Sequence, residues 1–87
     1  MKIMNAMEPI VINLFEQYFK PISLNCDCDK CRLDIILLTL NHLQPRYTSS
    51  QSGEALVKAI FMEPQLQSDV LKEITKAVSV IAENPLH

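Results

Sequence analysis

Apolar residues recur at spacings of three and four along most of the chain, and this pattern predicts helices. The first stretch begins near Met7 to Pro9, since proline is tolerated in a first helical turn. It is closed by Pro21, which lacks the N–H group that a helix interior needs. A start upstream at Ile3 with a bend at Pro9 is an alternative. The apolar positions share one helical face: Ile10, Val11, Leu14, Phe15, Tyr18, Phe19 and Ile22.

The second predicted helix runs from about Asp29 to Leu43 and is apolar on nearly every side. Ile35 and Leu38 form one apolar face, which we take as a candidate subunit interface. A helix that is apolar all round is buried on both sides, and in so small a domain one side is then a subunit contact. The sequence leaves open which face points inward. The face expected in the core comprises Leu33, Ile36, Leu37, Leu40 and Leu43.

Two further helices are predicted beyond the break at Gln44 to Tyr47 and a polar loop from Thr48 to Gly53. A short helix spans Glu54 to Phe61, and the last one begins at Glu63-Pro64 and ends at Asn84-Pro85. No stretch alternates with the period of a strand. The apolar stripe of the last helix comprises Leu66, Val70, Ile74, Ala77, Val78 and Ile81. The expected fold is therefore a small all-α, four-helix domain spanning residues 1–87.

The composition bears on assembly and location. The chain has 87 residues, of which 48% are hydrophobic, and one small core would struggle to hide so much apolar surface. We therefore expect a homodimer.

The net charge of −2 does not indicate a nucleic-acid binder. The longest apolar run, Ile35 to Leu38, is far too short to span a membrane. The N-terminus lacks the apolar core of a secretory signal, and the free thiols fit a reducing, cytoplasmic location.

Side-chain chemistry is concentrated at Cys26, Cys28 and Cys31, the three cysteines of the chain. They form a knuckle between the first two predicted helices, and one tight turn can aim all three sulfurs at one point. Zinc takes such sulfur ligands in tetrahedral geometry. Redox-active or oxidisable thiols, or no role at all, are the alternatives. Burial in an apolar core is not expected, because charged residues surround the cysteines: Asp27, Asp29, Lys30 and Arg32.

Three cysteines leave a fourth zinc ligand to be found. His42 lies eleven residues beyond Cys31 on the same predicted helix, about 16 Å away, and cannot complete the site. His87, Asp27, Asp29, a water molecule or a residue of another subunit remain. A catalytic zinc would keep its fourth position open for water. Against an enzyme, no Glu or His stands in a motif typical of a general base, and the single glycine of the chain excludes a glycine-rich phosphate loop.

A longer motif follows the cysteines. The run from Asp34 to Tyr47 reads DIILLTLNHLQPRY and is followed by Ser49 and Gly53. This run resembles the late competence development protein ComFB family, whose pattern is an acidic residue, an aliphatic helix ending in Leu-Asn-x-Leu, then Pro-x-Tyr and a Ser/Gly-rich turn. The cysteines upstream resemble the zinc-binding branch of that family. The resemblance covers roughly Asn13 to Pro85.

The resemblance implies a small, all-helical, cytoplasmic homodimer without established enzymatic activity. It also implies zinc on Cys26, Cys28 and Cys31. Some members of the family are reported to bind cyclic dinucleotides, so this chain too is a candidate second-messenger receptor. The expected function is thus a non-catalytic, zinc-binding regulatory or adaptor protein, with a protein partner or a cyclic dinucleotide as its ligand. A zinc-dependent enzyme is the third alternative.

Arg46 and Tyr47 are the candidate ligand-binding residues. The guanidinium could hold a phosphate and the phenol ring could stack on a base, with Ser49, Ser50 and Gly53 supplying hydrogen-bond donors. In the alternative interpretation, the Tyr47 ring packs on the core and Arg46 is solvated.

Overall fold

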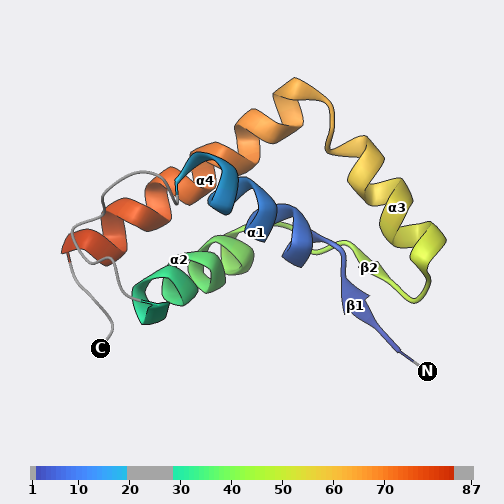
Figure 1. Ribbon diagram of the computed structural model, residues 1–87, viewed down its shortest axis with the longest axis horizontal. Helices are drawn as coiled ribbons and strands as arrows, with labels where there is room; N and C mark the ends of the chain where they lie inside the picture. Colours follow the sequence, from blue (N-terminus) through green and yellow to red (C-terminus); the bar gives the residue numbers. More distant parts are fainter. Residues whose placement is uncertain (1, 20–28, 84–87) are drawn as a thin grey trace.

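The computed structural model describes residues 2–19 and 29–83. The described part is built from four helices, as predicted, with one short antiparallel strand pair in addition (Figure 1). In chain order the elements are β1 (Met4–Asn5), α1 (Met7–Tyr18), α2 (Asp29–His42), β2 (Tyr47–Thr48), α3 (Gln51–Ile60) and α4 (Pro64–Glu83). In the strand pair Met4 lies opposite Thr48 and Asn5 opposite Tyr47. Strands of two residues are too short to show an alternating pattern, so the sequence gives no sign of them.

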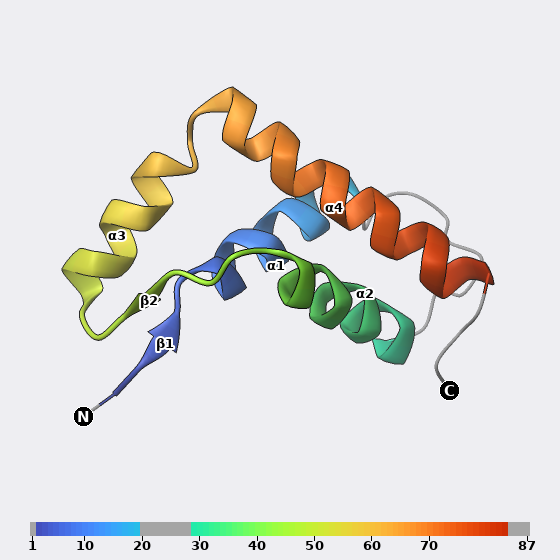
Figure 2. The same ribbon diagram turned by 180° about the vertical axis from the view of Figure 1, so that it is seen from behind.

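The core lies where α1 and α2 pack on α4, the longest helix (Figures 1 and 2). The predicted stripes of α1 and α4 are largely confirmed, since the buried residues of these helices other than Met7 fall on them at helical spacing. Tyr18 is the exception, because its side chain is 45% exposed. The buried set comprises Met7, Ile10, Val11, Leu14 and Phe15 of α1, and Val70, Ile74, Ala77 and Ile81 of α4. The Phe15 and Phe19 rings stack at the end of α1, with their centroids 6.1 Å apart.

Helix α2 faces the core with a central ridge that the prediction missed, while Ile36, Leu40 and Leu43 of the predicted face are partly buried against the core. Cys31, Ile35 and Thr39, four residues apart, form its buried ridge, and the Thr39 hydroxyl donates to the Ile35 carbonyl at 2.8 Å. Leu33 and Leu37, predicted to be core residues, are 54% and 48% exposed. The prediction that Ile35 faces a second subunit is wrong, because its side chain is buried within one chain. The reason is the mixed ridge, in which a thiol and a hydroxyl weaken the apolar signal of the inward face.

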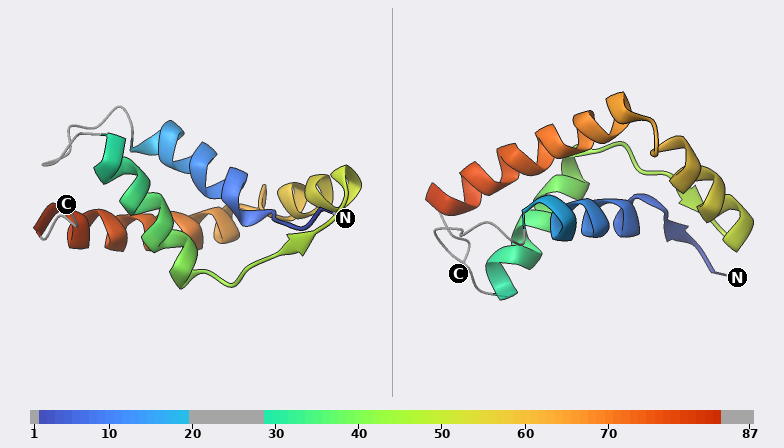
Figure 3. Two further views of the ribbon diagram at one scale, coloured as in Figure 1. Left: turned by 90° about the horizontal axis from the view of Figure 1, so that it is seen from below. Right: turned by 45° about the horizontal axis from the view of Figure 1, so that its top comes forward.

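Helix α3 projects away from the other three helices and has no buried residue (Figures 1 and 3). It begins at Gln51, earlier than predicted, because the Ser50 hydroxyl caps it by accepting from the Gly53 N–H at 3.0 Å. A side chain at Gly53 would collide with Thr48 Oγ1, so only glycine lets α3 lie this close to β2. Helix α4 is capped by the Glu63 carboxylate, which accepts from the Leu66 N–H at 3.0 Å.

The projecting helix makes the molecule more extended than is usual for its size. The radius of gyration is 13.3 Å, against about 12 Å expected for 87 residues. In the described part of the chain, no helix combines the length and the apolar character needed to cross a membrane.

Candidate functional site

Cys31 is the member of the cysteine cluster that the structure describes. It lies in the first turn of α2, and its side chain is fully buried in the hydrophobic core, next to Ile35. The expectation that it would avoid an apolar core is wrong, since consecutive residues on a helix point in different directions. Lys30 is exposed while Cys31 points inward. Cys26 and Cys28 lie outside the described residues.

The Cys31 sulfur is disulfide-bonded in this structure. Zinc binds thiolates, so for this sulfur the disulfide and the metal are alternative states. Within residues 2–19 and 29–83, no group of three or more His, Cys, Asp or Glu side chains could hold a metal ion. Of the candidates for the fourth ligand, Asp29 is described and exposed, whereas Asp27 and His87 lie outside.

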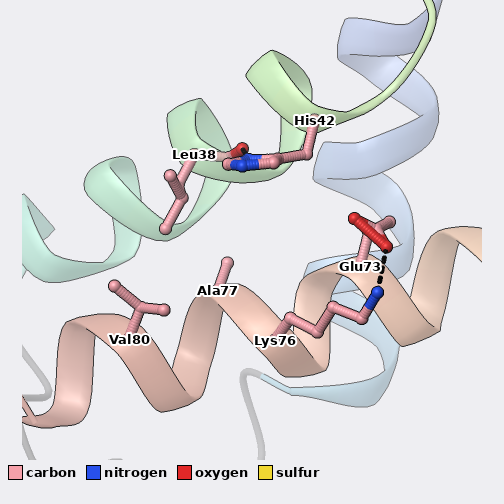
Figure 4. Close-up of a pocket in the computed structure, with 6 residues that line it drawn as sticks. All are labelled: Leu38, His42, Glu73, Lys76, Ala77 and Val80. Carbon is pink, nitrogen blue, oxygen red and sulfur yellow. Dashed lines mark hydrogen bonds and ion pairs between the residues drawn. The ribbon is translucent and has the colours of Figure 1, made fainter.

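His42 lies at the opposite end of α2 from Cys31. Its Nδ1 is 2.9 Å from the Leu38 carbonyl oxygen. Figure 4 shows it at a cavity of about 230 Å³ between α2 and α4. The floor of this cavity is apolar, and Lys76 at its rim pairs with Glu73 at 3.0 Å. The remaining lining residues are Leu38, Ala77 and Val80.

The Arg46–Tyr47 segment is held by an asparagine that the sequence analysis missed. The Asn5 side-chain oxygen accepts from the Arg46 N–H at 3.0 Å and from the Met7 N–H at 3.1 Å. The Ala6 N–H donates to the Arg46 carbonyl at 2.7 Å. Both backbone groups of Arg46 are therefore bonded to the chain that leads into α1. An asparagine side chain often accepts from the backbone N–H two residues further on, but nothing local signals the bond of Asn5 to a residue 41 positions away.

The side chains of Arg46 and Tyr47 do not converge within one chain. The Arg46 guanidinium carbon lies 5.5 Å from the centroid of the Phe61 ring, a cation–π contact. Tyr47 is 68% exposed, so the alternative in which its ring packs on the core is wrong. It lines a hollow of about 480 Å³ on the outer side of α2, together with Asn5, Glu8, Leu37, Leu40, Asn41, Leu43 and Pro45. Ser49 and Ser50 line another hollow, beside Lys2 and Glu54.

Replacing Asn5 by alanine should lower the free energy of unfolding by about 1–2 kcal/mol, because two backbone N–H groups lose their acceptor. In a domain of this size that corresponds to a melting temperature lower by roughly 4–8 °C per kcal/mol. Urea titration followed by circular dichroism measures the change. Asn13→Ala, an exposed position on α1, is the matched control and should change stability by less than about 0.5 kcal/mol. Equal stabilities of the two variants would contradict the role given to Asn5.

These observations define the class of protein. It is a small all-α protein in which three helices share a core, a fourth projects, and a short strand pair fixes the Pro-Arg-Tyr segment. The chain belongs to the late competence development protein ComFB family, whose family model matches residues 4–85. The resemblance stated from the sequence is thus confirmed.

Two comparisons agree with this membership. The competence protein ComFB of Bacillus subtilis (strain 168) is 25% identical over 83 residues, which cover 95% of this chain and 85% of that protein. A solved structure of the late competence protein ComFB from Bacillus subtilis is similar with a TM-score of 0.87 and 25% identity. That match covers 97% of this chain and 92% of the solved one. The family and this relative are both described as competence proteins.

Proposed function

We propose that this protein is a non-catalytic, dimeric regulatory or adaptor protein of the cytoplasm that binds a structural zinc ion through Cys26, Cys28 and Cys31. The observation that supports it most is the position of Cys31, at the start of α2 and fully buried against the core. A helix N-terminus favours a thiolate. A metal ion bound to this sulfur would therefore be attached to the part of α2 that packs on the other helices.

The donor set fits zinc in its chemistry. Three thiolates are soft ligands that select zinc over magnesium or calcium. The fourth position falls to Asp27, Asp29, His87, a water molecule or a residue of the second subunit. When bound, the metal supplies a cross-link between the cysteine knuckle and α2. The residues of this chain supply the rest, since Cys31 anchors the start of α2 and Ile35 packs one turn further along the core.

A combined metal and mass measurement tests this proposal. The protein is purified without chelators under reducing conditions, because the sulfur of Cys31 must be a thiolate to bind metal. Elemental analysis is expected to find one zinc per chain, and native mass spectrometry twice the 9.9 kDa chain mass. A metal-free protein would refute the zinc part of the proposal, and a monomer the dimeric part.

The second candidate function is that of a cyclic dinucleotide receptor. The exposed ring of Tyr47 favours it, because an aromatic face beside a hollow of about 480 Å³ is available for stacking on a base. The Arg46 guanidinium lies on the Phe61 ring. If one subunit binds the ligand, Arg46 and Tyr47 would contact different parts of it. Otherwise the two side chains that hold a phosphate and its neighbouring base would come from two subunits.

Replacing Arg46 by alanine should then abolish binding of a cyclic dinucleotide while leaving helical content and zinc unchanged. The guanidinium would be the phosphate ligand, and its charge-assisted hydrogen bonds have no replacement in alanine. Isothermal calorimetry with the parent, Arg46→Ala and Tyr47→Ala measures the affinities. Lys72→Ala, which removes one positive charge from an exposed site on α4, is the control for net charge. Equal affinities for the parent and Arg46→Ala would show that Arg46 does not bind the ligand and that its role is the contact with Phe61.

A further inference from the structure

The cavity between α2 and α4 lies at the edge of the core and is formed by one face of each helix (Figure 4). Residues that stand three and four apart emerge on the same side of a helix. The lining residues follow this spacing on both helices: Leu38 and His42 on α2, and Glu73, Lys76, Ala77 and Val80 on α4. The cavity is open to solvent, because Val80 is 50% exposed and the Lys76 side chain 67%. A small molecule can therefore enter it without the unfolding of a helix.

The floor of the cavity suits a short hydrocarbon body. In Figure 4 the Leu38 side chain points toward α4, and the Ala77 and Val80 side chains point toward α2. The cavity volume is about 230 Å³. A cavity of about 150 Å³ lined by aliphatic and aromatic side chains binds benzene, which has six non-hydrogen atoms. By proportion, the cavity of this protein has room for about nine such atoms, or one aromatic ring with a short chain and a polar end.

The hydrogen-bonding positions that remain open at the rim are acceptors. The Leu38 carbonyl oxygen can only accept, so its 2.9 Å contact assigns the proton of the neutral His42 ring to Nδ1. Nε2 of that ring is then an acceptor. The Glu73 carboxylate receives Lys76 Nζ on Oε2 at 3.0 Å, and among the residues that the structure describes no donor reaches Oε1. Both acceptors are available to a ligand that donates hydrogen bonds.

The charges at the rim favour a cationic donor. The Glu73 side chain is 22% exposed and that of Lys76 67%, so the carboxylate is the more shielded partner of the pair. An ion pair with so exposed a lysine contributes little to stability, and its carboxylate can accept a second cation on the other oxygen. A ligand carboxylate would be repelled by Glu73 instead. The net charge of the chain, −2, also favours a cation.

We propose that the cavity between α2 and α4 binds a small primary amine with an apolar body, such as an arylalkylamine. The apolar body lies on Leu38, Ala77 and Val80, and the ammonium group donates to Glu73 Oε1 and His42 Nε2. Because such a ligand contacts both helices, its binding stabilises the packing of α2 on α4. The inference depends neither on zinc at the cysteines nor on a ligand at the Arg46–Tyr47 segment.

The test is a titration of the full chain with three probes of one shape: 2-phenylethylamine, 2-phenylethanol and 3-phenylpropanoate. They share a phenyl ring and a two-carbon chain, and they end in a cation, a neutral hydroxyl and an anion. Methyl chemical shifts in NMR spectra report the site and the dissociation constants. The amine should bind with a dissociation constant on the order of 0.1–1 mM, as expected for so few atoms. It should bind at least about tenfold more tightly than the other two probes. The largest shift changes should occur at Ala77 and Val80.

Three variants separate the charge from the apolar floor. Glu73→Gln keeps the shape of the side chain and removes its charge, so it should weaken binding of the amine at least about tenfold and change that of the alcohol by less than about twofold. Glu16→Gln, the same change at an exposed position of α1, is the matched control and should alter neither affinity. Val80→Thr, similar in shape but more polar, should weaken both probes alike, by about two- to fourfold. Circular dichroism checks that each variant keeps the helical content of the parent.

Each outcome supports the proposal or overturns it. Selectivity for the amine in the parent, lost in Glu73→Gln alone, supports it. Tighter binding of the acid would make Lys76 the anchor and overturns the amine class, and equal binding of the three probes overturns it as well. Equal weakening by Glu16→Gln would show a general attraction of cations and no site. Shift changes centred on Tyr47, or no saturable binding at millimolar concentrations, refute the cavity. If Glu73→Gln does not fold, the three probes in the parent and in Val80→Thr still decide.

Discussion

Replacing Ile35 by alanine is expected to lower the free energy of unfolding by about 2–5 kcal/mol, the usual cost of truncating a large aliphatic side chain in a closed core. Ile35 is 2% exposed and lies in the middle of the buried ridge of α2. Its removal would leave a cavity between α2 and the other two core helices. Leu37→Ala, two residues away but 48% exposed, is expected to cost no more than about 1 kcal/mol.

Chemical denaturation of the parent and both variants measures this difference. The pair is informative because the apolar pattern of the sequence predicts the opposite ranking, with Leu37 in the core and Ile35 at a subunit contact. A larger loss for Leu37→Ala than for Ile35→Ala would show that α2 packs on its other side in solution. To exclude a contribution from dimer dissociation, the comparison is repeated at two protein concentrations.

Replacing Cys28 by serine is expected to abolish stoichiometric zinc binding and to lower the stability of the reduced protein by several kcal/mol. Metal that binds the folded chain and not the unfolded one contributes its binding free energy to folding, and structural zinc sites are worth about 10–16 kcal/mol in zinc-finger peptides at pH 7. The helical core of this protein also stabilises the fold without metal, so we expect a smaller loss of folding free energy than in a zinc finger. Structure should be lost near the start of α2, whereas α4 should be retained.

The measurement is thermal unfolding of the reduced protein with zinc, after chelation, and in the variant. The Cys28→Ser variant with zinc should have the same melting temperature as the chelated parent, since both lack the metal cross-link. Thr39→Ser is the control, because it alters another buried residue of α2 and keeps the hydroxyl that bonds to the Ile35 carbonyl. It should retain one zinc per chain. Identical melting of the parent with zinc and after chelation would contradict a structural metal.

The elements that sequence analysis predicted best are those with a wholly aliphatic or aromatic inward face. In α1 and α4 the buried residues are the ones that the periodic pattern marks, from Ile10 to Phe15 and from Val70 to Ile81. In α2 the pattern was right in part, since Ile36, Leu40 and Leu43 are partly buried against the core. It missed the central ridge, because Cys31 and Thr39 are less hydrophobic than the exposed Leu33 and Leu37. Packing against α4 decides the orientation, and a single helix carries no signal of it.

The candidate site was predictable only in part. The motif around Arg46 and Tyr47 is visible in the sequence, but the contact of Arg46 with Phe61 depends on where α3 ends in space. The same holds for Asn5, whose partner Arg46 is distant along the chain. The zinc assignment to Cys26, Cys28 and Cys31 stays a prediction, since two of these residues lie outside the described part of the chain.

The shared acceptor at Asn5 has a consequence for local opening. One side-chain oxygen receives the N–H groups of both Met7 and Arg46, so the first turn of α1 and the segment before β2 are tied together through one residue, and we expect them to open together. They form one small cooperative unit within the fold. In hydrogen exchange, the Arg46 amide should behave like a helix amide although its residue is exposed, and it should exchange together with the amide of Met7. Any molecule that grips Tyr47 would therefore also tighten the entry into the first helix.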